Sequence, residues 1–141
     1  MSYLQIEILI VGDYDKSIFY GVMGKYFAEP KYKKEMPYMS NKPTTTWFLV
    51  LEKGFLIGFG SVNELKNKII FESSYVEAEY RNKGVWKKIN EARTKYAVSK
   101  NKPLEVITKE EYLKKYWIEN GFEVYKQNGS YYYLRKGLTN E

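Results

Sequence analysis

Residues 79–93 read EYRNKGVWKKINEAR and place basic side chains on both sides of Gly84. Four apolar residues after this glycine fall on one helical stripe: Val85, Ile89, Ala92 and Tyr96. This spacing predicts an amphipathic helix that runs to about Lys100. A helix start leaves backbone N–H groups unpaired and carries a partial positive charge, so the turn before it can bind a phosphate. A solvated basic helix start explains the same residues.

The segments before this junction are rich in β-forming residues. The first strand is predicted over residues 4–11, and a helix follows that ends near Glu29, before Pro30. Three further segments, 46–51, 55–62 and 69–76, are separated by the turn sequences EKG and ELKN. They predict an antiparallel meander that leads directly into the glycine turn.

The segments after the long helix predict a strand, a helix and a hairpin. The strand covers residues 103–108, the helix 109–120, and the hairpin turns at Asn128–Gly129. Strands and helices are thus mixed along the whole chain, without an internal repeat or linker. We predict a mixed α/β (α+β) fold in which residues 1–141 form a single domain.

Charge and composition limit the chemistry. Lys and Arg number 23 against 17 Asp and Glu, a net charge of +6 that favours phosphate-bearing partners such as a nucleotide cofactor or a nucleic acid. The chain has no Cys and no His, which excludes disulfides, thiolate nucleophiles and Ser-His-Asp triads, and disfavours a metal site. Direct transfer between two bound substrates fits this composition better than a covalent intermediate on the protein. No long apolar run or secretion signal is present, so we expect a cytoplasmic protein without a membrane partner.

The block VEAEYRNKGVWKKINEAR resembles the acetyl-CoA-binding motif of the GCN5-related N-acetyltransferase (GNAT) superfamily. That motif reads Arg or Gln, two residues, Gly, one residue, then Gly or Ala, and Arg81 and Gly84 match it. Upstream, YVEAEYR is similar to the end of the family's fourth strand. Downstream, YLKKYWIENGFEVY is similar to its last helix and following strand, so the resemblance spans residues 46–135.

The resemblance implies a fold and a reaction. The fold would be a central, mostly antiparallel twisted sheet of about six or seven strands, with splayed fourth and fifth strands and about three or four flanking helices. The reaction would be direct transfer of an acetyl group from acetyl-CoA to a primary amine of a small molecule or macromolecule, by a monomer or homodimer. The implied cofactor-binding residues are Ser74, Val76, Arg81, Asn82, Lys83, Gly84, Trp86 and Lys87.

Three residues depart from the family pattern. Trp86 stands where the family has its second small residue, so the ring must point away from the cofactor or pack over it. Ala78 replaces a common proline. Trp117 stands where many members have a tyrosine that protonates the departing thiolate, and an indole has no such acidic proton. The neighbouring Tyr116 is therefore the candidate acid, with Tyr112 as the alternative, and both have a core role as the competing interpretation.

Glu72 is the candidate catalytic base. Strand alternation puts it on one face with Ile70, Ser74 and Val76, and a carboxylate within an apolar strand is unfavourable unless it is paired, exposed or functional. Family members often use a carboxylate on this strand to deprotonate the ammonium substrate. A salt bridge or an exposed sheet edge is the competing interpretation.

By the same resemblance, the loop KYKKEMPYMSNKPTTTW lies beside the acceptor pocket, and its aromatic residues Tyr32, Tyr38 and Trp47 are the candidate substrate-binding walls. Covering the sheet is their alternative role. Two other functions remain open. One is a non-catalytic module of the same fold that binds CoA or a protein; the other, suggested by charge and aromatic content, is a nucleic-acid-directed acyltransferase or base-modifying protein.

Overall fold

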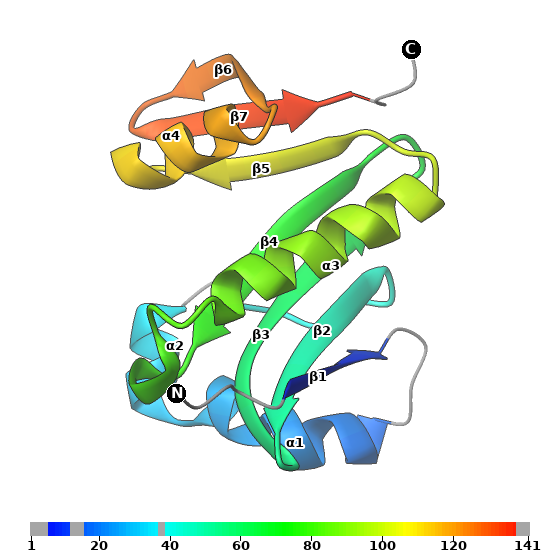
Figure 1. The fold of residues 1–141 in the computed structure, drawn as a ribbon, viewed down its shortest axis with the longest axis vertical. Helices are drawn as coiled ribbons and strands as arrows, with labels where there is room; N and C mark the ends of the chain where they lie inside the picture. Colours follow the sequence, from blue (N-terminus) through cyan, green and yellow to red (C-terminus); the bar gives the residue numbers. More distant parts are fainter. Residues whose placement is uncertain (1–5, 12–15, 37–38, 138–141) are drawn as a thin grey trace.

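The computed structural model describes residues 6–11, 16–36 and 39–137, which form one seven-stranded sheet with helices on both faces (Figure 1). The strands are β1 Ile6–Val11, β2 Thr45–Glu52, β3 Phe55–Glu64, β4 Ile69–Val76, β5 Leu104–Thr108, β6 Glu123–Asn128 and β7 Tyr131–Lys136. The α-helices are α1 Lys16–Ala28, α2 Pro30–Glu35, α3 Val85–Ser99 and α4 Glu111–Glu119. A 3₁₀ turn, η1, spans Ala78–Tyr80. None of the described helices is long and apolar enough to cross a membrane.

The sheet order is β1-β2-β3-β4-β5-β7-β6, and β4–β5 is the parallel pair among antiparallel neighbours. The pairing of β4 with β5 covers Ile69–Phe71 and Leu104–Val106. Beyond these residues β4 continues to Val76 and β5 to Thr108 without pairing to each other. The predicted mixed fold and the splay between the fourth and fifth strands are confirmed.

Helices α3 and α4 pack on one face of the sheet, and α1 and α2 pack on the other (Figure 1). Val85 and Ile89 of α3 pack against Val50 and Ile57, whereas α1 packs its residues against Trp47 and Phe59. Helix α3 lies close to β3 because Gly60 has no side chain: a Cβ there would come within 2.5 Å of Ile89. The glycine thus lets α3 pack closely against β3.

An irregularity in β4 changes the face of one predicted site residue. Gly60 pairs with Ser74 and Val62 with Phe71, so two steps along β3 oppose three along β4. Phe71 and Ser74 therefore both face the α3 side, where Phe71 is buried and Ser74 meets Trp86. Glu72 lies on the opposite side from Ser74 and Val76. The prediction of one shared face is wrong because strict alternation assumes a regular strand.

Helix α1 buries one side of its surface. Its buried residues include Phe19, Met23 and Tyr26, whereas Val22 is 40% exposed. The predicted start of the first strand, residues 4 and 5, lies outside the described residues. Helix α4 begins at Glu111, two residues after the predicted start, and ends one residue before Asn120. The predicted hairpin is confirmed, but its two turn residues are Gly129 and Ser130, because Asn128 still pairs with Tyr131.

Candidate active site

The turn before α3 contains two left-handed residues. Gly84 has φ 82° and Asn82 has φ 62°, both left-handed, and Gly84 serves as the N-cap without a side-chain capping bond. The first intrahelical bond runs from the Lys88 amide to the Gly84 carbonyl, 3.1 Å. The amides of residues 85–87 thus precede the hydrogen-bonded part of the helix, as the geometry of a helix start requires. Their N–H groups point along the helix axis towards the turn.

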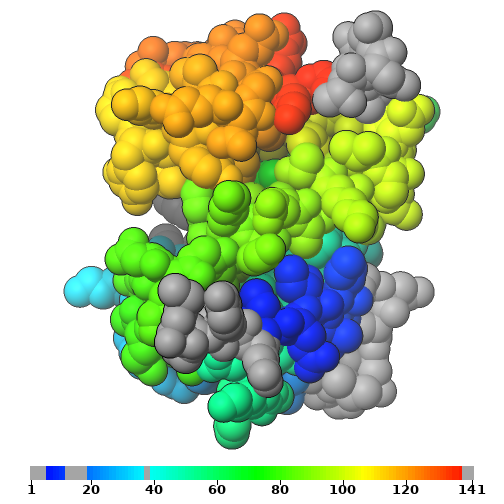
Figure 2. Space-filling view, viewed as in Figure 1, coloured from blue at the N-terminus to red at the C-terminus, as the bar shows by residue number. Residues whose placement is uncertain are grey.

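A groove of about 780 Å³ opens at this helix start, between α3, the end of β4 and α4. Figure 2 shows the hollow between the yellow surface of α4 and the green surface at the start of α3. Most of the predicted cofactor-binding residues line it: Ser74, Val76, Arg81, Asn82, Gly84, Trp86 and Lys87. Lys83 instead has its ammonium 5.7 Å from the centre of the Tyr80 ring.

Arg81 ties the glycine turn to its surroundings. Its Nε donates a hydrogen bond of 2.8 Å to the Val76 carbonyl, and its guanidinium lies 5.4 Å from the centre of the Tyr75 ring. Its terminal nitrogen also lies 3.9 Å from a carboxylate oxygen of Glu35 in α2. The side chain is still half-exposed, so part of its charge faces the groove. Arg81 both braces the turn and contributes positive charge to the groove.

Trp86 crosses the cleft between α3, β4 and α4. Its indole Nε1 donates to the Ser74 hydroxyl at 3.2 Å, and its ring centre lies 4.7 Å from that of Tyr116 and 5.8 Å from that of Trp117. The ring lines the groove and also a second cavity behind it. Trp86 therefore stands between the two cavities, bonded to β4 on one side and packed on α4 on the other.

The second cavity, about 480 Å³, occupies the opening where β4 and β5 separate. Glu72 lines it and forms a salt bridge with Lys42, whose Nζ is 3.2 Å from both carboxylate oxygens. The Glu72 side chain is 28% exposed. The ion pair agrees with the salt-bridge interpretation of Glu72. Its role as a base stays a prediction, for a residue in a cavity that adjoins the groove. Lys42 was not singled out from the sequence, because a lysine in a loop carries no pattern.

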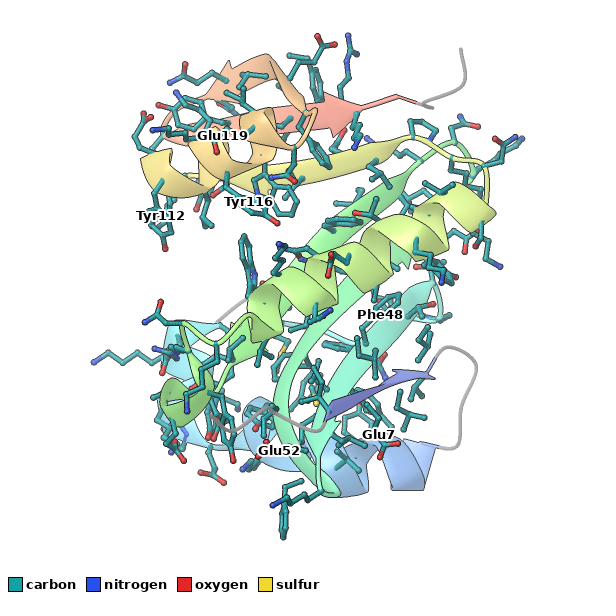
Figure 3. All side chains as sticks on the ribbon, viewed as in Figure 1. Glu7, Phe48, Glu52, Tyr112, Tyr116 and Glu119 are labelled. Carbon is teal, nitrogen blue, oxygen red and sulfur yellow. The ribbon has the colours of Figure 1, made fainter. Side chains whose placement is uncertain are left out.

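Tyr116 and Trp117 have different surroundings although they are adjacent. Trp117 is 4% exposed and packs edge-on against Phe71 and Phe122, so it is a core residue. Tyr116 is half-buried and lines the groove. Figure 3 shows Tyr112 and Tyr116 extending from α4 towards the start of α3, and Tyr112 is 71% exposed. Of the two rings, that of Tyr116 packs beside Trp86.

Arg93 is a buried charge that the sequence interpretation missed. The side chain is 1% exposed, and Nη1 donates to the carbonyls of Ser61, 3.1 Å, and Glu72, 3.0 Å. Nη2 donates to Asn90, and the guanidinium lies 4.5 Å from the centre of the Phe71 ring. Burial lowers the pKa of Arg93 to about 9, so the group stays charged at neutral pH. It holds β3 and β4 together where β4 is irregular, at the wall of the second cavity.

The aromatic residues predicted as acceptor-pocket walls have other positions. Trp47 is fully buried against α1, and its indole donates to Asn41 at 3.0 Å. Tyr32 is 2% exposed and donates to Glu77 at 3.1 Å; burial and Glu77 raise the pKa of Tyr32 to about 12. Both are packing residues rather than exposed pocket walls, because α1 and α2 cover this face of the sheet. Tyr38 lies outside the described residues.

Comparisons with known proteins support the fold through structure alone. No family model and no curated protein matches the sequence. An acyl-CoA N-acyltransferase from Pseudomonas aeruginosa superposes with a TM-score of 0.76 at 12% identity, covering 94% of this chain and 100% of that one. The PaiA N-acetyltransferase from Thermoplasma acidophilum, solved with coenzyme A, has a TM-score of 0.67 at 17% identity, with 95% and 99% covered.

A third solved structure carries the family name. An acetyltransferase of the GNAT family from Staphylococcus aureus Mu50 superposes with a TM-score of 0.65 at 16% identity, covering 94% of this chain and 100% of that one. In all three superpositions, almost the full length of this chain matches almost the full length of the other protein. The motif around Gly84 and the splayed parallel pair β4–β5 agree with that likeness. The chain therefore has the fold of the GNAT acyltransferases, the superfamily that its sequence motif resembles.

Proposed function

We propose that this chain is an acetyl-CoA-dependent N-acetyltransferase that transfers an acetyl group directly to a primary amine. One observation carries the proposal: a groove that begins at the left-handed turn before α3 adjoins a cavity that contains a carboxylate, Glu72. A phosphate-binding helix start and a base for an ammonium group are the two sites that such a reaction needs. The neighbour solved with coenzyme A has the same fold.

The residues of the groove fit the cofactor at its pyrophosphate end. Amides at the start of α3, together with Arg81 and Lys87, offer hydrogen-bond donors and positive charge to a pyrophosphate. The edge of β4 from Ser74 to Val76 offers backbone groups to the pantetheine arm. The arm must pass Trp86 to bring its thioester to Glu72, so the indole has to leave the Ser74 hydroxyl.

The chain would supply a base, an acid and a shaped cleft. Glu72 would take a proton from the acceptor ammonium and leave a neutral amine, which is the nucleophile for the thioester. Tyr116 would donate a hydrogen bond or proton to the departing thiolate, since Trp117 is buried and has no acidic proton. Acetyl-CoA, when bound, supplies the thioester. The chain itself holds the amine and removes its proton.

Acetyl-CoA at millimolar concentration is expected to raise the melting temperature by several degrees, because a ligand that binds only the folded state stabilises it by mass action. Arg81→Glu combined with Gly84→Asp is expected to abolish this shift, since it places negative charge and a side chain where the pyrophosphate would lie. The matched control, Lys126→Glu with Gly129→Asp, reverses a charge and replaces a left-handed glycine in the β6–β7 hairpin instead. An unchanged melting temperature for the original chain with acetyl-CoA would refute the proposal.

Trp86→Ala is expected to lower the Kd for CoA by about tenfold, because binding no longer requires the indole to leave Ser74 and Tyr116. Isothermal titration calorimetry measures the change. Ser74→Ala, which removes the hydroxyl but keeps the ring, is expected to give a smaller gain. A higher Kd for Trp86→Ala would mean instead that the ring packs on the bound cofactor.

A protein of this fold that binds CoA without catalysing transfer can be distinguished by two measurements on the same chain. A module that only binds CoA would show the shift in melting temperature but would release no thiol with any primary amine. Thiol release from acetyl-CoA, followed with a panel of small amines and amine-bearing peptides, therefore separates binding from transfer. The same panel identifies the acceptor class.

A further inference from the structure

Lys42 lies on a loop that is anchored close to the second cavity. Its backbone N–H donates to the Thr45 hydroxyl at 3.2 Å, and the preceding Asn41 accepts the Trp47 indole at 3.0 Å. These bonds tie the loop to the start of β2. From this position the four-carbon side chain of Lys42 reaches into the cavity and ends at Glu72.

The Lys42 ammonium occupies the position that the proposed mechanism requires of an acceptor nitrogen. A base must lie within hydrogen-bond distance of the proton it removes, and the Nζ of Lys42 is 3.2 Å from both oxygens of Glu72. The cavity they share adjoins the groove, because Ser74 and Trp86 line both. A thioester that passed Trp86 would therefore meet a primary ammonium of this chain already in contact with the base.

We propose that Lys42 is an internal acceptor, so that the chain acetylates its own Lys42 Nζ. The inference rests on the proposed function and adds a modification site to it. Glu72 takes one proton from the ammonium, and the neutral amine attacks the thioester carbonyl carbon. The new C–N bond forms as the C–S bond breaks, and the second proton lost by the nitrogen ends on the departing CoA thiolate. The products are an amide at Lys42, free CoA and one proton released through Glu72.

The modification changes the site. An acetylated lysine is neutral, so its attraction to the Glu72 carboxylate is lost and the ion pair is broken. Glu72 then faces the cavity without a competing ammonium from the chain. An external amine no longer has to displace Lys42 to reach the base.

Lys68 is a matched control within the same chain. Its side chain is 40% exposed, against 41% for Lys42, and its Nζ lies 3.1 Å from Glu105, so the two lysines agree in exposure and pairing. Lys68 pairs with a carboxylate of β5 and is not among the residues that line the second cavity. Chemical acetylation by free acetyl-CoA should thus treat both lysines alike, and catalysis at the cavity should separate them.

The test is peptide mass spectrometry of the full chain after timed incubation with acetyl-CoA. We expect Lys42 to be acetylated at least about tenfold faster than Lys68, with a first-order rate that does not change on dilution of the protein. Glu72→Gln is expected to reduce the Lys42 rate to that of Lys68 and to leave Lys68 unchanged. Glu105→Gln is expected to leave the Lys42 rate unchanged.

Equal rates at Lys42 and Lys68, a Lys42 rate insensitive to Glu72→Gln, or a rate that rises with protein concentration would each overturn the inference. Other measurements show whether the proposed N-acetyltransferase function itself fails. If acetyl-CoA does not shift the melting temperature, the proposed function falls. If the shift and thiol release with external amines are present while Lys42 stays unmodified, only the internal acceptor is refuted.

Discussion

Arg93→Ala is expected to lower the free energy of unfolding by about 3–5 kcal/mol, as for the loss of one partner in other buried charged networks. The substitution removes the donors to the Ser61 and Glu72 carbonyls and to Asn90; the bonds to Ser61 and Asn90 are buried, and the bond to Glu72 is partly buried. Each buried acceptor left without a partner costs about 1–3 kcal/mol, and the lost side chain also leaves a cavity beside Phe71. Denaturant unfolding of the variant measures the loss.

Two further variants make this result specific. Lys95→Ala, on the exposed side of the same helix, is expected to change stability by less than about 0.5 kcal/mol. Arg93→Met keeps most of the volume but no donors, so it separates the unpaired carbonyls from the cavity. If Arg93→Ala were as stable as Lys95→Ala, the guanidinium would not be holding β3 to β4, and the interpretation of this contact would be wrong.

Glu72→Gln is expected to lower kcat/KM for a primary amine by about 10²–10⁴ at neutral pH, the typical contribution of a general base. The amide keeps the size of the carboxylate but cannot accept the ammonium proton. The remaining activity should rise with pH towards the pKa of the amine, near about 10.4 for an alkyl amine, because free amine then enters the site without needing the base. Steady-state kinetics across a pH series measure both effects.

Glu105→Gln serves as the matched control for the activity measurement. Glu105 also pairs with a lysine from within a strand, but it accepts from Lys68 and Tyr125 rather than lining the second cavity. We expect its kcat/KM to stay within about threefold of the original chain. A Glu72→Gln variant with the same near-normal kcat/KM would remove Glu72 from the catalytic role and leave it as half of a salt bridge.

The sequence predicted the elements around Gly84 because several independent patterns meet there. Strand alternation, a glycine turn and a helical stripe all change at the same few residues, and residues that follow the helical period, such as Val85 and Ile89, are buried as expected. The resemblance to a known motif then supplied the strand splay, which no local pattern contains. Distance between strands is a property of tertiary packing, so periodicity alone does not report it.

The positions that the sequence predicted wrongly, or did not predict, have identifiable physical causes. Alternation placed Glu72 with Ser74 because nothing in the residues of β4 marks the extra residue between Phe71 and Ser74. Arg93 was missed because its charge suggested an exposed position, although it lies four residues after Ile89 and four before Ala97, both fully buried. That four-residue spacing could have indicated that Arg93 lies on the buried side of the helix. The placement of Tyr32 and Trp47 depended on a loop whose path is set by α1 and α2, and loop paths are not encoded in short patterns.

The separation of β4 from β5 leaves an unpaired strand edge in the middle of the sheet. Beyond Phe71, β4 pairs with β3 on one side and presents its other edge to the cleft rather than to β5. An extended ligand arm with amide groups, lying along this edge, would take the place of a missing strand. Recognition of that kind depends on main-chain atoms, which substitutions other than those to proline leave in place. It is therefore compatible with the identities of 12–17% at which the same architecture recurs.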